Sequence, residues 1–181
     1  MRIVGGDKKG LTLSTKPGGG TRPLAARVKA SLFEIISGRL PGIYFCDFFA
    51  GNGAVGLEAL SRGAERALFV EKNPACIRII RENARRCGFA DRAEIVQGDV
   101  LKVIPTLARR DVDAVIFLGP PYDTGLAHES LIRLGQSESF LAELLVIAEV
   151  RKKEMLLPVY GALRQMREKF YGDTRLVFYQ K

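Results

Sequence analysis

The sequence of 181 residues has little of what several protein classes require. It contains one histidine and three cysteines, and it has no uninterrupted apolar run of the length, about 18 residues, that a membrane-spanning helix needs. Residues 1–6 lack the apolar core of a secretory signal. We therefore expect a cytoplasmic protein with no membrane span.

The few cysteines and the single histidine also restrict the chemistry. Cys46, Cys76 and Cys87 are odd in number and do not have the spacing of a metal site. With only His128 to add, a protein zinc site is not expected, and no Ser-His-Asp arrangement can be read. We interpret the cysteines as reduced core residues and His128 as a residue on the surface of a helix.

Positive charge, by contrast, is in excess and is concentrated near the N-terminus. The net charge is +8, and the first 40 residues hold eight Lys or Arg residues against Asp7 and Glu34. A local excess of this kind favours a polyanion through counterion release, although a solvated basic surface has the same composition. The candidate contacts to nucleic-acid phosphates are Arg2, Lys8, Lys9, Arg22, Arg27 and Lys29.

From residue 43 onward, apolar runs of strand length alternate with helical patterns. The seven predicted strands are 43–48, 67–70, 93–96, 112–118, 144–150, 167–171 and 175–179. Strands separated by helices imply right-handed crossovers and an α/β fold with a mainly parallel, seven-stranded sheet, closed by an antiparallel C-terminal hairpin. β-prone runs at 2–4 and 11–15 predict an N-terminal β-hairpin with a basic tip. We expect residues 1–20 to form this hairpin extension and a linker, and residues 21–181 to form the main domain.

A glycine-rich turn follows the first of these strands. Gly51-Asn52-Gly53-Ala54-Val55-Gly56 fits G-x-G-x-x-G, a pattern that lets the backbone approach a ligand at an electropositive helix N-terminus. Glu71 ends the next strand, 20 residues after Gly51, where a carboxylate can accept hydrogen bonds from ribose hydroxyls. NAD enzymes and S-adenosylmethionine (SAM) methyltransferases both have a carboxylate at this point.

Two further carboxylates separate these two classes. Asp47 precedes the glycines, where it would repel a pyrophosphate but suits SAM, which carries an ammonium and a sulfonium group. Asp99 follows the third strand and can accept a hydrogen bond from an adenine amino group, although both aspartates could also be helix caps. The candidate SAM-binding residues are Asp47, Phe48, Ala50, Gly51, Gly53, Glu71, Lys72, Asp99 and Val100.

The fourth strand ends in a rigid corner, Gly119-Pro120-Pro121-Tyr122, which we take as the candidate catalytic segment. The prolines fix φ and present carbonyl oxygens but no N–H groups, and Tyr122 can stack on a planar base. An exocyclic amine is a poor nucleophile, so acceptors on its N–H groups and stacking of its ring are needed to direct the nitrogen at a methyl group. The target base is therefore expected to be unpaired or flipped.

These two motifs together, 47–53 and 120–122, resemble the amino-group methyltransferases of nucleic acids. Residues 1–6, 21–23 and 56–64 extend the similarity to the RsmD family, over nearly the whole chain and most weakly over 124–166. The resemblance implies a Rossmann-like class I SAM-dependent methyltransferase fold with an N-terminal RNA-binding extension. It also implies transfer to the N2 amine of a guanine in small-subunit (16S) ribosomal RNA, either free or within a small subunit or assembly intermediate. Nothing in the sequence suggests an obligate dimer, so we expect a monomer.

One position departs from the family pattern. The family has an acidic residue where this chain has Gly119, and glycine offers no side-chain acceptor for the target amine. The sequence therefore predicts weakened or absent transfer, and faster transfer by a Gly119→Asp variant. Two alternatives stay open: a non-catalytic RNA-binding homologue that keeps the cofactor pocket, and a NAD-dependent oxidoreductase, which would have no use for the double-proline corner.

Overall fold

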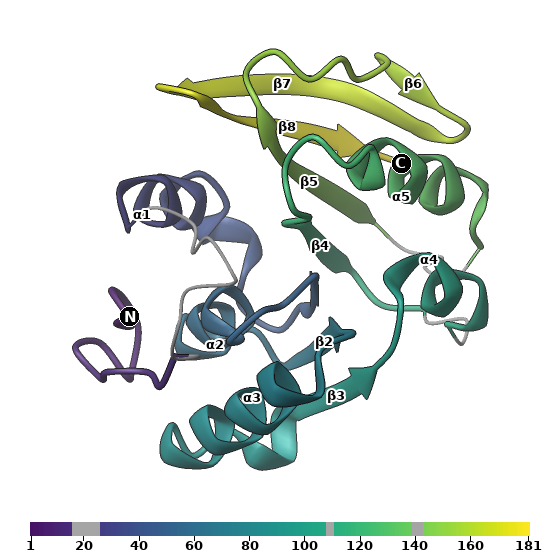
Figure 1. Cartoon of the computed structure of the whole chain (residues 1–181). Coiled ribbons are helices and arrows are strands. Elements are labelled where there is room, and N and C mark those ends of the chain that lie inside the picture. Colours follow the sequence, from purple (N-terminus) through teal and green to yellow (C-terminus); the bar gives the residue numbers. More distant parts are fainter. Residues whose placement is uncertain (16–25, 108–110, 139–142) are drawn as a thin grey trace.

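The computed structural model describes residues 1–15, 26–107, 111–138 and 143–181, and its centre is a sheet of eight strands (Figure 1). The strand order is β3-β2-β1-β4-β5-β8-β7-β6. The parallel part comprises β1 (Tyr44–Phe48), β2 (Arg66–Glu71), β3 (Ala93–Gln97), β4 (Ala114–Leu118) and β5 (Leu144–Arg151). The antiparallel part comprises β6 (Val159–Tyr160), β7 (Leu163–Tyr171) and β8 (Thr174–Gln180).

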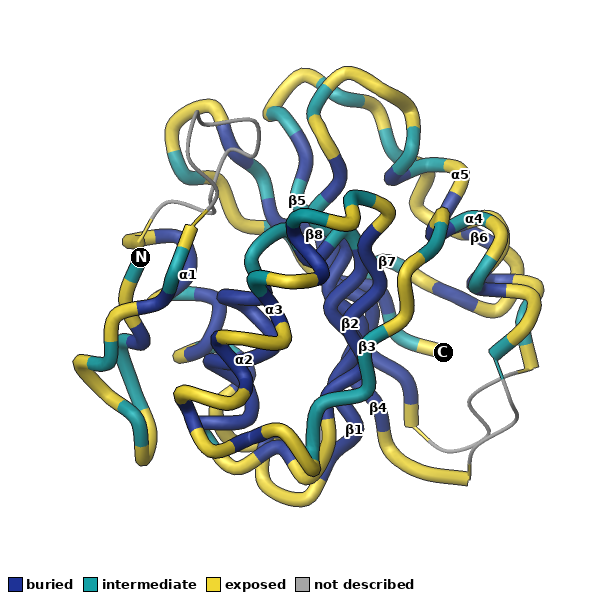
Figure 2. Tube along the Cα trace, turned by 60° about the horizontal axis from the view of Figure 1, so that its bottom comes forward, coloured by how far each residue is buried: buried dark blue, intermediate teal, exposed yellow. Residues whose placement is uncertain are grey.

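Helices cover both faces of this sheet. One core cluster packs α1 (Ala26–Ile35), α2 (Ala54–Ser61) and α3 (Pro74–Arg86) on one face, and a second packs α4 (Val100–Val103) and α5 (Leu126–Gln136) on the other. Short 3₁₀ turns occupy Ser37–Arg39 (η1), Ala90–Arg92 (η2) and Ile104–Thr106 (η3). Figure 2 shows the buried sheet between helices whose outer sides are exposed. Because both faces are covered, every residue of β1 and β4 is buried, as near-continuous apolar strands should be.

The predicted α/β fold with a mainly parallel sheet and an antiparallel C-terminal hairpin is confirmed. All seven predicted strands are present, and the structure adds an eighth, β6, at the edge of the sheet. β6 has only two residues, between Pro158 and Gly161, so its sequence carries no period that could reveal a strand. Within the described residues, no helix combines the length and the apolar character needed to cross a membrane.

The predicted N-terminal hairpin is also present. Arg2 and Thr12 form an antiparallel bridge, and the Ile3 amide donates to the carbonyl of Leu11 at 3.0 Å. Ile3 and Leu13 are buried and belong to the same core cluster as α1, α2 and α3. The hairpin is therefore packed against the main domain through its apolar side chains, and its predicted connector falls outside the described residues.

The order of the strands creates one natural binding place. β1 lies between β2 and β4, so the chain leaves β1 toward β3 on one side and returns to β4 on the other. In open α/β sheets, ligands bind outside the carboxyl ends of the strands at such a switch point. The glycine-rich turn follows β1 and the Pro-Pro-Tyr corner follows β4, so the topology brings the two predicted motifs to one edge.

Candidate cofactor and substrate site

A cavity of about 760 Å³ lies at this edge of the sheet. Its wall takes residues from the carboxyl ends of five strands, and we distinguish two sides. The β1–β3 side contains Asp47, Phe49, Ala50, Gly51, Glu71, Lys72, Asp99 and Val100. The β4–β5 side contains Phe117, Gly119, Pro120, Pro121, Tyr122, Glu149 and Arg151. The cavity thus brings together nearly all of the residues predicted for cofactor binding and for catalysis.

The turn after β1 has an unusual backbone. Phe49, Gly51 and Gly53 all have positive φ, at 65°, 57° and 78°. A bulky residue at positive φ is strained, and strain of this kind is concentrated at functional sites. Gly56 is required for a different reason, since a Cβ there would lie 2.3 Å from the ring of Phe69 on β2. The glycines therefore serve the tight turn and the close packing of α2 on the sheet.

Asp47 is the most deeply buried acid of the cavity wall. Its side chain is 2% exposed, and Oδ2 accepts a hydrogen bond from the Gly56 amide at 2.8 Å. Burial raises the pKa of the Asp47 carboxyl to about 8; the Gly56 hydrogen bond acts in the opposite direction, and the neighbouring Glu71 carboxylate adds to the rise. A cationic group placed in the cavity beside Asp47 would favour its ionised form.

Glu71 and Asp99 each accept hydrogen bonds from backbone amides. Glu71 accepts hydrogen bonds from the amides of Gly51 at 2.9 Å and Asn73 at 2.8 Å, which join the turns after β1 and β2. Asp99 accepts from the Leu101 amide at 2.9 Å and caps α4. The helix-cap interpretation of Asp99 is therefore correct, and the same residue also borders the cavity. Exposed Lys72 stands at the rim beside Glu71.

Two of the predicted cofactor residues lie elsewhere than expected. The side chain of Phe48 is 0% exposed and belongs to the core between the sheet and α5, so Phe49, not Phe48, presents its side chain to the cavity. The alternation of side chains along β1 explains this correction, because Phe48 and Asp47 point to opposite faces. Gly53 forms the N-cap of α2 and shapes the turn instead of lining the wall.

The β4–β5 side is held by side chains from distant parts of the chain. The Tyr122 hydroxyl donates to Glu149 Oε1 at 2.6 Å and lies 3.0 Å from Thr174 Oγ1. The guanidinium carbon of Arg151 lies 5.4 Å from the centre of the Tyr122 ring. Sequence analysis missed Glu149, Arg151 and Thr174; the available signal was a charged pair near the end of the otherwise apolar β5.

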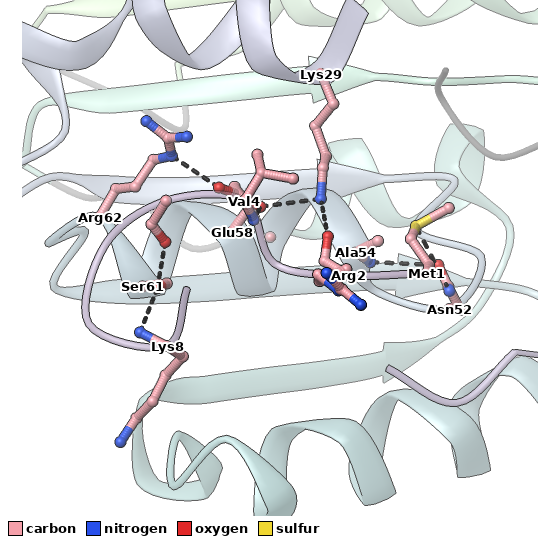
Figure 3. A network of polar contacts seen from close by, with 12 residues as sticks. Met1, Arg2, Val4, Lys8, Lys29, Asn52, Ala54, Glu58, Ser61 and Arg62 are labelled. Atoms are coloured by element: carbon pink, nitrogen blue, oxygen red, sulfur yellow. Dashed lines mark hydrogen bonds and ion pairs between the residues drawn. The ribbon is translucent and has the colours of Figure 1, made fainter. Parts of the chain in front are cut away.

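The predicted phosphate contacts do not form one group. Arg2, Lys9 and Arg27 are exposed, Lys8 is half-buried, and Arg22 lies outside the described residues. The Lys8 amide donates to Ser61 Oγ at the end of α2, whereas Met1 contacts Asn52 beside the cavity (Figure 3). The hairpin therefore runs along α2, with its basic tip at the end of α2 remote from the cavity.

The prediction that Lys29 contacts phosphate at the surface is wrong. Its side chain is 2% exposed, and its ammonium group lies 2.9 Å from Glu58 Oε2 and donates to the Arg2 carbonyl at 2.8 Å (Figure 3). Glu58 also accepts from the Val4 amide at 2.9 Å and from Arg62 Nε at 2.8 Å. Burial of charges requires such pairing, so Lys29 fastens the hairpin to α1 and α2.

Comparison with known proteins adds independent evidence. The family described as Conserved hypothetical protein 95 matches residues 1–180. "Putative rRNA methyltransferase YlbH" of Bacillus subtilis is 31% identical over 100% of this chain and 99% of that protein, and "Ribosomal RNA small subunit methyltransferase D" of Escherichia coli is 31% identical over 100% and 90%. The solved structure of "Putative methyltransferase yhhF" from Escherichia coli superposes with a TM-score of 0.88 at 28% identity, covering 100% of this chain and 97% of that one. The chain therefore belongs to the Conserved hypothetical protein 95 family, and its resemblance to the RsmD methyltransferases is confirmed.

Proposed function

We propose that this protein is a SAM-dependent methyltransferase that acts on the exocyclic N2 amine of a guanine in small-subunit (16S) ribosomal RNA. One observation carries the proposal: a single cavity joins the carboxylates that end three successive strands to the Pro-Pro-Tyr corner. The relatives named as ribosomal RNA methyltransferases match the chain over its full length and support the same substrate class.

The donors in the cavity fit SAM better than a dinucleotide. Asp47 faces the cavity from a buried position, where a positively charged amino-acid group would compensate for the loss of hydration of its carboxylate. A pyrophosphate in the same place would keep the Asp47 carboxyl in its neutral form and gain no attraction from it. When bound, SAM supplies a methyl group on a positively charged sulfur, and it accounts for the carboxylates that the NAD alternative leaves unexplained.

Each residue of the β1–β3 side then has a role in holding SAM. Asp47 and the backbone of the turn from Ala50 to Asn52 hold the methionine part. Glu71 accepts from the ribose hydroxyls, because a carboxylate retains acceptor capacity beside the two backbone bonds that it already accepts. Asp99 and Val100 border the adenine, with Asp99 as acceptor and Val100 as the apolar contact.

The β4–β5 side holds the base. The Pro120 carbonyl accepts from the target amine, and the ring of Tyr122 stacks on the base in an orientation fixed by its bonds to Glu149 and Thr174. Gly119 and Pro121 shape the corner. The RNA phosphates are contacted by Arg2, Arg27, Lys8 and Lys9. The hairpin tip lies at the far end of α2, so the RNA must extend beyond the cavity by at least the length of this helix, about 12 Å.

The proposal is tested by transfer of tritiated methyl groups from SAM to small subunits that lack the modification, with free 16S ribosomal RNA as a parallel substrate. Mapping of the labelled base then identifies the target nucleotide. We expect one labelled guanine, modified at N2, and Asp47→Ala should strongly reduce the label at a SAM concentration that does not saturate the wild type. Label on protein alone, or on no RNA at all, would contradict the proposal.

One observation favours a second candidate function. Because residue 119 is glycine, the end of β4 contributes no acidic side chain to the base corner. A non-catalytic RNA-binding homologue would lack the acid in the same way. Such a protein would bind SAM and ribosomal RNA and leave the RNA unlabelled in the same assay. The two candidates therefore differ in one measurement.

A further inference from the structure

The corner that would receive the target amine offers backbone acceptors but no side-chain acceptor at position 119. Pro120 and Pro121 offer carbonyl oxygens, and Gly119 has no side chain. A nitrogen that gains a methyl group becomes positively charged unless it loses a proton. A carbonyl can accept a hydrogen bond but is a weak base, so a carboxylate in the corner would have a use that the backbone cannot fill.

The register of the sheet places such a carboxylate beside Gly119. β4 and β5 are parallel, and their last paired residues are Leu118 and Ala148, so Gly119 and Glu149 follow as neighbours at the same edge. Residues at matching positions on adjacent strands point to the same face. Both residues border the cavity, together with Pro120, Pro121 and Tyr122.

The carboxylate of Glu149 is also fixed in the base corner. Its Oε1 accepts the 2.6 Å hydrogen bond from the Tyr122 hydroxyl, and Tyr122 is the residue whose ring would stack on the base. A carboxylate has about four lone-pair positions, so Glu149 can accept a hydrogen bond from an amine in addition to the bonds that it already makes. The Tyr122 bond therefore holds the Glu149 carboxylate in the cavity wall, at the hydroxyl end of the ring that would stack on the base.

The space at position 119 agrees with this arrangement. A Cβ built on Gly119 would lie 2.9 Å from Cε1 of Phe117, closer than side-chain carbons normally approach. The ring of Phe117, which also borders the cavity, thus takes up room that a side chain at 119 would use. Glu149 reaches the corner from the neighbouring strand without this conflict.

We propose that Glu149 is a catalytic residue that accepts a hydrogen bond from the target amine and takes its proton during methyl transfer. The inference rests on the proposed function. In this step the amine nitrogen forms a bond to the methyl carbon, the electron pair of the broken carbon–sulfur bond stays on sulfur, and one N–H proton passes to the Glu149 carboxylate. Glu149 thus supplies from β5 the acid that β4 lacks.

The test compares four proteins in single-turnover transfer to unmodified small subunits: wild type, Glu149→Gln, Gly119→Asp/Glu149→Gln and Tyr122→Phe. Glutamine still accepts from Tyr122 but is a very weak base, so Glu149→Gln should lower the rate by about 100-fold or more. The carboxylate introduced at position 119 in Gly119→Asp/Glu149→Gln should raise the rate at least about tenfold above that of Glu149→Gln. Tyr122→Phe removes the Tyr122–Glu149 bond and keeps the carboxylate, so its loss should be smaller, about tenfold.

A binding measurement separates contact with the amine from an effect on folding. With S-adenosylhomocysteine present, wild type should bind a synthetic RNA spanning the mapped guanine about tenfold more tightly than the same RNA with inosine, which lacks the N2 amine. Glu149→Leu should lose this preference and keep its affinity for S-adenosylhomocysteine. Glu143→Gln, one residue before β5 at the opposite edge of the sheet, is the matched control and should behave as wild type.

The outcomes distinguish this inference from the function on which it rests. Absence of transfer by the wild type to any ribosomal RNA overturns the proposed function and the inference with it. Transfer by the wild type that Glu149→Gln leaves unchanged overturns the inference alone. The inference is also overturned if Glu149→Gln and Tyr122→Phe lose the same amount of activity and Gly119→Asp does not restore the loss in Glu149→Gln. In that case Glu149 would only position Tyr122.

Discussion

The two sides of the cavity are built in different ways. On the β1–β3 side, each carboxylate accepts from a backbone amide nearby in the chain: Asp47 from Gly56, Glu71 from Asn73 and Asp99 from Leu101. On the β4–β5 side, Tyr122 bonds to side chains 27 and 52 residues away. One side therefore follows from local turns, and the other exists only after the sheet has closed around β5 and β8.

This difference indicates how each side responds to change. Local turns held by backbone bonds keep their shape when one distant contact is lost. Side chains held by one another depend on the register of three strands, so a single substitution is transmitted to its partners. The β1–β3 side also has contacts between distant parts of the chain: the Gly51 amide donates to Glu71, and Met1 and Lys29 bring the N-terminal hairpin and α1 to its wall.

The largest expected effect tests how much the N-terminal hairpin contributes to this side. Lys29→Ala would leave Glu58, which is 0% exposed, with Arg62 as its remaining cation among the described residues. Loss of one partner from a buried ion pair typically costs about 3–5 kcal/mol, and we expect a reduction of this size in the free energy of unfolding, measured with urea.

Arg39→Ala is the matched control for Lys29→Ala. Arg39 lies 3.2 Å from Glu143 in a pair whose side chains are 46% and 66% exposed, so its loss should cost less than about 1 kcal/mol. Equal destabilisation by the two substitutions would show that the hairpin anchor contributes little. The β1–β3 side would then not depend on the hairpin for its stability.

A smaller effect is expected at Asp47, through pH. Because burial raises the pKa of Asp47 to about 8, the carboxyl is mainly protonated at pH 7 in the free protein. Binding of the SAM ammonium group should therefore release a proton, and the affinity should rise from pH 6 to pH 8. Calorimetry in two buffers of different ionisation enthalpy measures the release. Asp47→Asn should release none and, at pH 8, bind about 30- to 100-fold more weakly, the value of one hydrogen bond to a charged group.

The same pKa makes a prediction for the stability of the free protein. The pKa rises from 3.8 to about 8 on folding, so the native state holds the Asp47 proton more tightly than the unfolded state. The contribution of Asp47 is therefore most favourable below about pH 4 and declines as the pH rises to 8. Asp47→Asn should remove this decline. The unfolding free energy of the variant minus that of the wild type should therefore increase from pH 5 to pH 8. A constant difference would contradict the raised pKa.

A third effect, about tenfold, is expected where the hairpin meets the glycine turn. The buried side chain of Asn83 accepts from the Ser14 amide at 2.8 Å and donates to the carbonyls of Ser14 and Asn52 at 3.1 Å. Asn83→Ala removes these bonds, and we expect SAM to bind about tenfold more weakly, since a lost buried hydrogen bond costs about 1–2 kcal/mol. Glu82→Ala, which loses exposed contacts to Ser14 and Arg86, is the control. Unchanged affinity in Asn83→Ala would mean that the turn holds its shape without the hairpin.

The sequence predicted the β1–β3 side well for the same reason that this side is local. A turn, a helix cap and a strand end leave signals within a few residues, so Asp47, Glu71 and Asp99 could be placed at one edge from the strand pattern alone. Lys29 and Glu149 could not be placed in this way. The burial of Lys29 depends on Glu58, 29 residues away, and the position of Glu149 depends on the register of β4 and β5. β6 was missed because two residues have no period.

The smallest effect is expected from Gly119→Asp alone, for which the sequence and the proposed role of Glu149 predict different results. The sequence predicts faster transfer, because the substitution restores an acceptor to a corner that lacks one. With Glu149 already at this corner, a second carboxylate repeats a function that is present, and its Cβ must displace the ring of Phe117. Mild overpacking costs about 1 kcal/mol, so we expect the single-turnover rate to change by less than about fivefold. A gain of 100-fold would show that Glu149 does not act on the amine and that the β4–β5 side needs its acid on β4.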